Sequence, residues 1–547
     1  MSITRIIGGT LTKTATTGNI DIRATEGNVD FIAAQHNIWH GEEEGIFYHD
    51  YEPLHPADSI NNRLELTLNI FFDGTANNRN NTEARENNTK DYQKKSNKRD
   101  DSYENDYTNI ARGYDAISVK EIKQISVYVE GVGTTDLKTD DALPMGIAQR
   151  AVFWNTGIKD KVKRGCELGA LKIQKTADGK PIDKLTINVF GFSRGAATAR
   201  HFLAITESSP YTVKISNDGH FWFPGEIKQR QYPINTTDKT KPAYPESFEI
   251  KLGYFGRCLV NEGVFEIKEV FFNFVGLYDT VSSHGVSHKN DIKDLGLNAV
   301  KKAKMVFQIS AADEYRENFD LTNIHSAGLK GLELTLPGVH SDIGGSYLAC
   351  DVERSVVYSE TYTEIRDENN NFVPYIKNIE AFKKLLVNEG WYRNHELMPE
   401  FKYDKNETYL VGTRQLENTY DKIALNKMIM VSKQKQFGVI YDETIEQQKT
   451  NISDPFIANI FIQLTNYTQA VMVHRNEAIK EGKPVAEYLK ESKQISYLDY
   501  LDHEDLKKLR HRYLHWSVKA DQFGLGPRFY GVLPIEKRKR EIHNDNE

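Results

Sequence analysis

The sequence predicts an α/β fold in which a mostly parallel sheet carries helices on both faces. Short β-rich apolar runs recur along the middle of the chain, and each ends in small and polar residues. The stretches between these runs are long enough for crossover helices, which parallel strands require. Ligands of such sheets bind at the carboxyl ends of the strands, so the polar motifs at the ends of the runs are expected to form the site.

Five runs have this design. The first alternates apolar residues and stops at Asp-Gly, with Leu64, Leu66, Leu68, Ile70 and Phe72 as its apolar set. Such alternation is typical of a strand. The other runs are ISVYVEGVGT (125–134), LTINVFGFS (185–193), EVFFNFVGLYDT (269–280) and LELTLPGVHSD (332–342).

The pattern divides the chain into three parts. Residues 1–60 read as a β-rich docking arm, because Asn19, Asn28 and Asn37 recur nine residues apart, each before a β-branched residue. Three copies of a repeat are few, and chance similarity is the alternative. Residues 61–350 carry the sheet pattern, with an insertion at about 206–268. Residues 351–547 show mainly amphipathic helical patterns.

Two polar segments are expected to be solvated. The stretch from Glu83 to Tyr107 is dense in Asn, Lys, Asp and Glu and predicts an exposed loop. The residues EKRKREIHNDNE at 536–547 predict a charged tail in solvent.

Composition excludes several classes of protein. The formal net charge of −7 gives no broad attraction to nucleic acid, so no nucleic-acid partner is expected. Three widely spaced cysteines suggest neither a disulfide framework nor a zinc cluster. No secretory signal and no apolar run of about 20 residues stand out, which predicts synthesis in the cytoplasm and export, if any, by another route.

The motif Gly191-Phe192-Ser193-Arg194-Gly195 matches a nucleophile elbow. The strand-to-helix turn of an elbow is so tight that its flanking positions have little room for a side chain, which is why glycine occupies them. A β-rich run precedes the motif and a helix rich in small residues follows it. Ser193 is therefore the candidate nucleophile of an α/β-hydrolase-like domain, an ordinary strand-to-helix connection being the alternative.

A serine nucleophile needs a base and an orienting carboxylate, which follow in the order Ser, Asp or Glu, His in this fold. Asp279 and His340 each end a β-rich run in that order. His515 in HRYLHWS is a second candidate base. The backbone N–H of Arg194 and the loop with Gly74 and Thr75 are candidate oxyanion donors, although Asp-Gly could be a plain turn.

Metal sites are weakly indicated, and no cofactor is expected. The pairs His36 and His40, and His284 and His288, have helical spacing but no helical context and no clear third ligand. Asp342 could bind calcium or orient the His340 loop, and the second interpretation is favoured.

Five motifs in order resemble the catalytic domain of the type VI secretion phospholipase effectors with a GxSxG elbow. They are FFDGTANN (71–78), VEGVGT (129–134), VFGFSRGAATAR (189–200), GLYDTVSSHG (276–285) and PGVHSDIGGSY (337–347). YDKIALNKM and HRYLHWS resemble its C-terminal portion more loosely. The resemblance implies an α/β-hydrolase core, a Ser193-Asp279-His340 triad and hydrolysis of acyl esters of glycerophospholipids in the envelope of rival bacteria.

The same resemblance implies a membrane phospholipid substrate, a secretion spike protein that receives the N-terminal arm, and a cognate immunity protein. Two other functions stay open: a spike cargo or docking protein with secondary or no catalysis, and a soluble esterase with no lipid substrate.

A lipid substrate requires an apolar mouth or a movable lid. Three segments could supply it, and ordinary core packing is the alternative for each. They contain Phe221, Trp222 and Phe223; Phe456, Ile457, Ile460 and Phe461; and Phe382, Leu385 and Leu386.

Overall fold

This computed structural model describes residues 64–94, 101–120, 123–141, 157–234, 244–282, 291–361, 363–366, 372–375, 377–402, 404, 406–522, 525–527 and 540–546. The expected docking arm and the two histidine pairs, His36 with His40 and His284 with His288, lie outside these residues.

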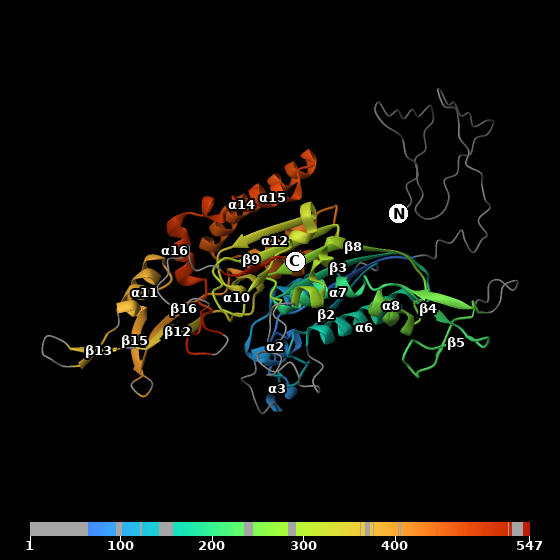
Figure 1. Ribbon diagram of the computed structural model, residues 1–547, viewed down its shortest axis with the longest axis horizontal. Helices are drawn as coiled ribbons and strands as arrows, with labels where there is room; N and C mark the ends of the chain where they lie inside the picture. Colours follow the sequence, from blue (N-terminus) through green and yellow to red (C-terminus); the bar gives the residue numbers. More distant parts are fainter. Residues whose placement is uncertain are drawn as a thin grey trace, which may run out of the picture. The chain divides into compact units, whose positions relative to one another are not determined.

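A six-stranded sheet forms the centre of the described chain (Figure 1). All neighbouring strands pair in parallel, which confirms the predicted sheet. In spatial order the strands are β11 (Gly331–Leu336), β9 (Met305–Ala311), β8 (Ile267–Tyr278), β3 (Ile182–Phe192), β1 (Leu64–Phe72) and β2 (Gln124–Val129). Five of them are the five predicted runs, and β9 was not anticipated.

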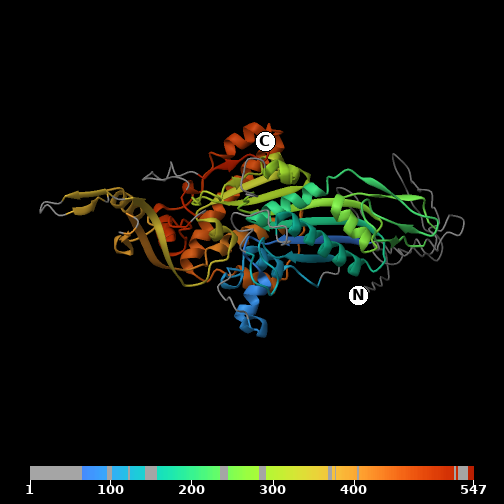
Figure 2. The same ribbon diagram turned by 60° about the horizontal axis from the view of Figure 1, so that its bottom comes forward.

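Helices cover both faces of the sheet because successive side chains of each strand point to opposite faces. Phe72 packs with α6 (Ile158–Ala177), α7 (Arg194–Ile205) and α8 (Gly253–Asn261) on one face, which Figure 2 shows in front of the strands. Phe71 packs on the other face, with α5 (Asn109–Ala116), α12 (Asp421–Ser432) and α14 (Pro455–Glu481).

The strand order creates a switch point beside β1. The chain passes from β1 to β2 on one side and then to β3 on the other. Connections that leave a sheet in opposite directions open a crevice at the carboxyl ends of the two strands, where ligands of such sheets bind. The carboxyl ends of β1 and β3 carry the Asp73-Gly74-Thr75 loop and Ser193.

The insertion builds a small core of its own. It contains β4 (Tyr211–Lys214), β5 (His220–Phe221), β6 (Arg230–Gln231) and β7 (Ser247–Ile250). It begins after α7 has run back from Ser193, and its last helix, α8, leads into the amino end of β8. The insertion therefore lies toward the amino ends of the strands, opposite to the carboxyl ends where Ser193 lies.

The C-terminal part is mainly helical, as predicted, but it also contains an antiparallel sheet that was not predicted from the sequence. Its helices, besides α12 and α14, include α11 (Lys377–Asn388), α13 (Glu443–Thr450), α15 (Val485–Ser492) and α16 (His503–Arg512). Its strands are β12 (Asp351–Thr361), β16 (Glu407–Leu416) and β15 (Leu397–Lys402), with a hairpin of β13 (Thr363–Arg366) and β14 (Phe372–Tyr375). No helix within the described ranges combines the length and the apolar character needed to cross a bilayer.

The prediction of an exposed loop at 83–107 is right in exposure for most of residues 86–94 but wrong in secondary structure. Short helices occupy its described part, namely α2 (Arg79–Glu86), α3 (Lys90–Lys94) and α4 (Asp101–Glu104). Their polar residues satisfy one another: the buried Asn81 amide donates to Ser102 Oγ at 2.9 Å, and its oxygen accepts from Leu137 N at 2.6 Å. The polar side chains on either side of the exposed residues 86–94 thus form a packed network.

The predicted solvated tail is also wrong for residues 540–546. β17 (Ile542–His543) pairs in parallel with β10 (Leu321–Thr322), and Asp545 is only 1% exposed. This segment is held by ion pairs with residues far away in the sequence.

Candidate active site

Ser193 lies at a sharp turn between β3 and α7. Its backbone has φ 58° and ψ −128°, a conformation that L-residues rarely adopt. Its amide donates to Tyr278 O at 3.0 Å, and Val281 N donates to its carbonyl at 3.3 Å. The turn is thus fixed against the end of β8, which carries Asp279. Strain of this kind collects at functional sites, where the surrounding structure maintains it.

The two glycines of the motif are required by close packing. A Cβ at Gly191 would lie 2.4 Å from Gly195 O, inside the turn itself. A Cβ at Gly195 would lie 2.2 Å from Asp73 O, at the carboxyl end of β1. These contacts give the predicted reason for glycine at both positions, and they bring the first turn of α7 against the switch point.

Asp279 and His340 form a buried pair. His340 begins α10 (His340–Gly344), and its Nδ1 lies 2.5 Å from Asp279 Oδ2, with both side chains at most 5% exposed. Asp279 Oδ1 accepts from Ala311 N at 2.9 Å and from Arg540 Nη1 at 2.6 Å. Burial raises the pKa of Asp279, but the Arg540 charge and the His340 hydrogen bond outweigh it and hold that pKa well below its ordinary value. The carboxylate is therefore ionised.

The His340 ring lies between two aromatic side chains. Its centroid is 4.6 Å from the ring of Phe192, next to Ser193, and 5.1 Å from the ring of Phe319. Burial lowers the pKa of His340 below 6.5, although Asp279 opposes this change. A neutral imidazole at neutral pH can accept a proton, as a general base must.

Glu314 and Arg316, which follow β9 in the chain, hold the backbone of His340 in place. Neither residue was predicted from the sequence. Glu314 Oε2 accepts from His340 N at 3.2 Å, while Arg316 holds the same carboxylate through Nε and Nη2 at 2.9 and 2.7 Å. Arg316 lowers the pKa of the buried Glu314 to about 2, against the effect of burial. Nothing in the local sequence ADEYR distinguishes this pair from a surface ion pair.

His515, the alternative base, pairs with Asp342 and not with Asp279. His515 Nδ1 lies 2.7 Å from Asp342 Oδ1, and Asp342 Oδ2 accepts from Val339 N at 2.9 Å. Asp342 therefore ties HRYLHWS to the turn that precedes His340. The described residues contain no cluster of three or more His, Cys, Asp or Glu side chains that could hold a metal ion.

The Asp73-Gly74-Thr75 loop closes on the elbow. Asp73 Oδ1 accepts from Gly74 N and Thr108 Oγ1, both at 2.7 Å, so the Gly74 amide is already engaged. Burial raises the pKa of Asp73 to about 6. Arg194 Nε donates to Thr75 Oγ1 at 2.6 Å, which joins the residue after the nucleophile to this loop. Of the two predicted loop donors, Thr75 fits an oxyanion site better than Gly74.

The predicted lid segments take part in core packing. Phe221 and Phe223 are 1% exposed within the separate core of the insertion, which is the core-packing alternative, whereas Trp222 on the same segment is 42% exposed. On α14, Phe456 stacks on Tyr513, Ile457 and Ile460 are buried, and Phe461 packs against the main core. On α11, Phe382 and Leu386 are buried and Leu385 is partly buried.

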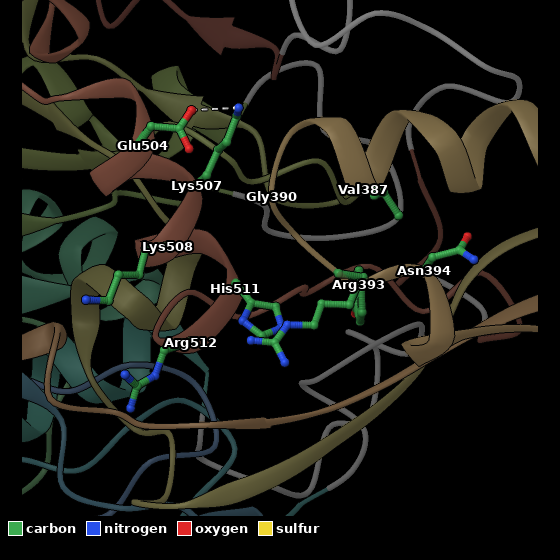
Figure 3. A pocket seen from close by; sticks show the side chains of 10 residues that line it. Val387, Gly390, Arg393, Asn394, Glu504, Lys507, Lys508, His511 and Arg512 are labelled. Atoms are coloured by element: carbon green, nitrogen blue, oxygen red, sulfur yellow. Dashed lines mark hydrogen bonds and ion pairs between the residues drawn. The ribbon is translucent and has the colours of Figure 1, made fainter.

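A hollow of about 600 Å³ between α11 and α16 is a separate feature (Figure 3). Basic side chains line it, among them Arg393, Lys507, Lys508, His511 and Arg512. Glu504 at its rim pairs with Lys507 at 2.9 Å. Ser193, Asp279 and His340 are not among its lining residues, so it is distinct from the candidate active site.

A parallel sheet with a strained serine after one strand, and an Asp–His pair after two others, defines an α/β-hydrolase-like protein. The family described as the type VI secretion system (T6SS) phospholipase effector Tle1-like catalytic domain matches residues 67–360, more than half of the chain. The chain belongs to this family of secreted phospholipase effectors.

One solved structure agrees in fold. "Structure of the Tle1 effector bound to the VgrG spike from the Type 6 secretion system" matches with TM-score 0.52 and 20% identity, over 88% of this chain and 94% of that chain. An uncharacterised protein from Pseudomonas aeruginosa matches more weakly, with TM-score 0.34 and 15% identity, over 76% of this chain and 53% of that chain. No curated protein matches the chain.

Proposed function

We propose that this chain is a serine esterase of phospholipase A type, which hydrolyses acyl esters of glycerophospholipids through Ser193, His340 and Asp279. The observation that best supports it is the buried Asp279–His340 pair beside the strained turn of Ser193. Membership of a phospholipase effector family supports the ester substrate.

In this proposal Ser193 Oγ attacks the ester carbonyl carbon while His340 Nε2 takes its proton. Asp279 holds the Nδ1–H side of the ring and stabilises the imidazolium that forms. The N–H of Arg194 and the Thr75 loop donate to the oxyanion of the tetrahedral intermediate. His340 then protonates the leaving alkoxide, and water releases the acyl group from Ser193 by the same steps.

We also propose that the protein is delivered through a secretion spike by residues 1–60 and acts at the periplasmic side or membrane of a target cell. The fold match to an effector solved on a VgrG spike supports the first part. An enzyme that degrades bacterial lipids also implies a cognate immunity protein in the producing cell.

Purified protein tests the proposal when compared with Ser193→Ala on phospholipid vesicles and on a short soluble ester. Free fatty acid and lysophospholipid from the wild type alone, identified by mass spectrometry, are the expected products. A wild type inactive on both substrates would favour the cargo function. Activity on the soluble ester alone would favour a non-lipid esterase.

A further inference from the structure

Residues 540–546 pack beside the candidate active site, with the side chains of Arg540 and Asp545 buried and Glu541, Ile542 and Asn546 exposed. Leu321 N donates to Glu541 O at 3.0 Å, and Asn323 N donates to His543 O at 3.0 Å, which makes β17 a strand partner of β10. Both bonds run from N–H groups in or next to β10 to carbonyl groups in or next to β17. The segment is thus a structural element, although its composition is that of a solvated tail.

A buried ion pair anchors the segment to the nucleophile helix. Asp545 Oδ2 lies 2.6 Å from Arg200 Nη2 on α7, and neither side chain is exposed. Ser326 donates to the same carboxylate from its backbone N and its Oγ, at 2.8 and 2.6 Å. Because α7 begins directly after Ser193, the anchor fixes the helix that carries the elbow.

The other end of the segment reaches the Asp–His pair. Arg540 Nη1 donates to Asp279 Oδ1 at 2.6 Å, on the oxygen opposite to the one that faces His340. Arg540 Nε donates to the carbonyl of Phe319, whose ring packs edge-on against His340. One guanidinium therefore orients the carboxylate and one wall of the imidazole site.

We propose that residues 540–546 complete the active site: Arg540 is a positioning residue that fixes the Asp279 carboxylate, and the Asp545–Arg200 pair anchors the segment. The inference rests on the proposed function, since it assigns Arg540 to that same site. Without the docked segment, Asp279 loses the Arg540 ion pair on Oδ1, which leaves the Ala311 N–H on that oxygen, so the carboxylate is held less firmly against His340.

Point variants test the positioning role in the full chain. Arg540→Met should lower kcat on a short soluble ester by about 10²-fold with little change in KM, because a misplaced catalytic group costs about that much. Arg540→Lys should restore part of the rate. Arg393→Met, in the separate basic hollow, is the matched control and should retain the wild-type kcat. Wild-type kcat in Arg540→Met would overturn the proposal.

The titration of His340 gives a readout that a purely structural role would not move. The charged groups around its ring are Asp279, Glu314, Arg316 and Arg540. The hydrogen bond and charge of Asp279 raise the pKa of His340 more than the Arg540 charge lowers it, so a misplaced Asp279 carboxylate in Arg540→Met should lower that pKa and shift the acid limb of kcat/KM to lower pH. NMR of histidine-labelled protein, assigned with His340→Ala, measures this shift even if the protein hydrolyses no ester. An unchanged or raised pKa of His340 would refute the positioning role of Arg540.

Complementation tests the docking. A chain that ends at residue 535 should lose most activity, and a peptide of residues 536–547 should restore it, whereas the same peptide with Asp545→Asn should not. Peptide binding is followed separately by fluorescence anisotropy, so a failure of the proposed esterase function is distinguishable from a failure of docking. A folded truncated chain with wild-type activity, or equal binding of both peptides, would overturn the proposal. If the truncated chain does not fold, the point variants decide.

Discussion

Gly195→Ala should inactivate the protein without unfolding it. The added Cβ would lie 2.2 Å from Asp73 O and 2.4 Å from Phe72 O, whereas real Cβ contacts stay above 3.0 Å. Both obstacles are backbone atoms at the carboxyl end of β1, so α7 must move away by about 0.8 Å. That movement displaces the Ser193 turn by a similar amount, and a displacement of about 1 Å at a reacting group costs about 10²-fold in rate.

The assay is kcat on a short soluble ester, with near-ultraviolet circular dichroism to verify the tertiary fold. Gly157→Ala is the matched control, because Gly157 lies at the start of α6 on the same face of the sheet, has an ordinary φ of −76°, and would place its Cβ 3.5 Å from the nearest side-chain atom. The control should retain the wild-type rate. If folded Gly195→Ala kept its rate within about threefold of wild type, close packing would not explain the glycine.

Three further predictions concern the triad, its pH dependence and delivery. Ser193→Ala, Asp279→Asn and His340→Ala should each reduce ester turnover by about 10⁴-fold, with little extra loss in double variants, because the triad acts as a unit; near-wild-type activity in His340→Ala together with inactivity in His515→Ala would reverse the choice of base. Because burial lowers the pKa of His340 and only the neutral ring accepts a proton, the acid limb of kcat/KM should lie below pH 6.5, and a limb above it would contradict that assignment. Removal of residues 1–55 should leave ester hydrolysis intact and abolish co-purification with the spike protein, whereas loss of folding would make the arm part of the core.

The sheet and the elbow could be predicted because their signals are local. Leu66, Leu68, Ile70 and Phe72 alternate in the sequence and share one face in the structure. The glycines around Ser193 are predictable because any such tight turn leaves no room for a Cβ at these positions. Asp279 and His340 could be predicted for a related reason. The carboxyl ends of parallel strands lie on the same side of the sheet, so polar residues that follow separate strands come close together there.

The aromatic segments show where local reasoning fails. Phe221 and Phe456 were candidates for a lipid-facing surface, with core packing as the alternative, because the sequence does not reveal which side chains are exposed. The structure packs Phe221 among the aromatic rings of the insertion and Phe456 against Tyr513. An apolar side chain has the same appearance in a core as at a membrane surface, and only its neighbours distinguish the two.

The prediction of a solvated tail failed at residues 540–546 for the opposite reason, because charged side chains normally lie in solvent. Arg540 pairs with Asp279, which is 261 residues away in the sequence, and Asp545 pairs with Arg200, which is 345 residues away. A buried charge is costly unless a partner offsets its desolvation, so each of these four residues depends on the fold that brings its partner close. Removing one partner leaves the other buried and unpaired, at a typical cost of about 3–5 kcal/mol. Asp545→Asn should therefore lower the free energy of unfolding by about this amount, as measured by urea denaturation. A change below about 1 kcal/mol would mean that Arg200 is solvated and that the segment does not dock.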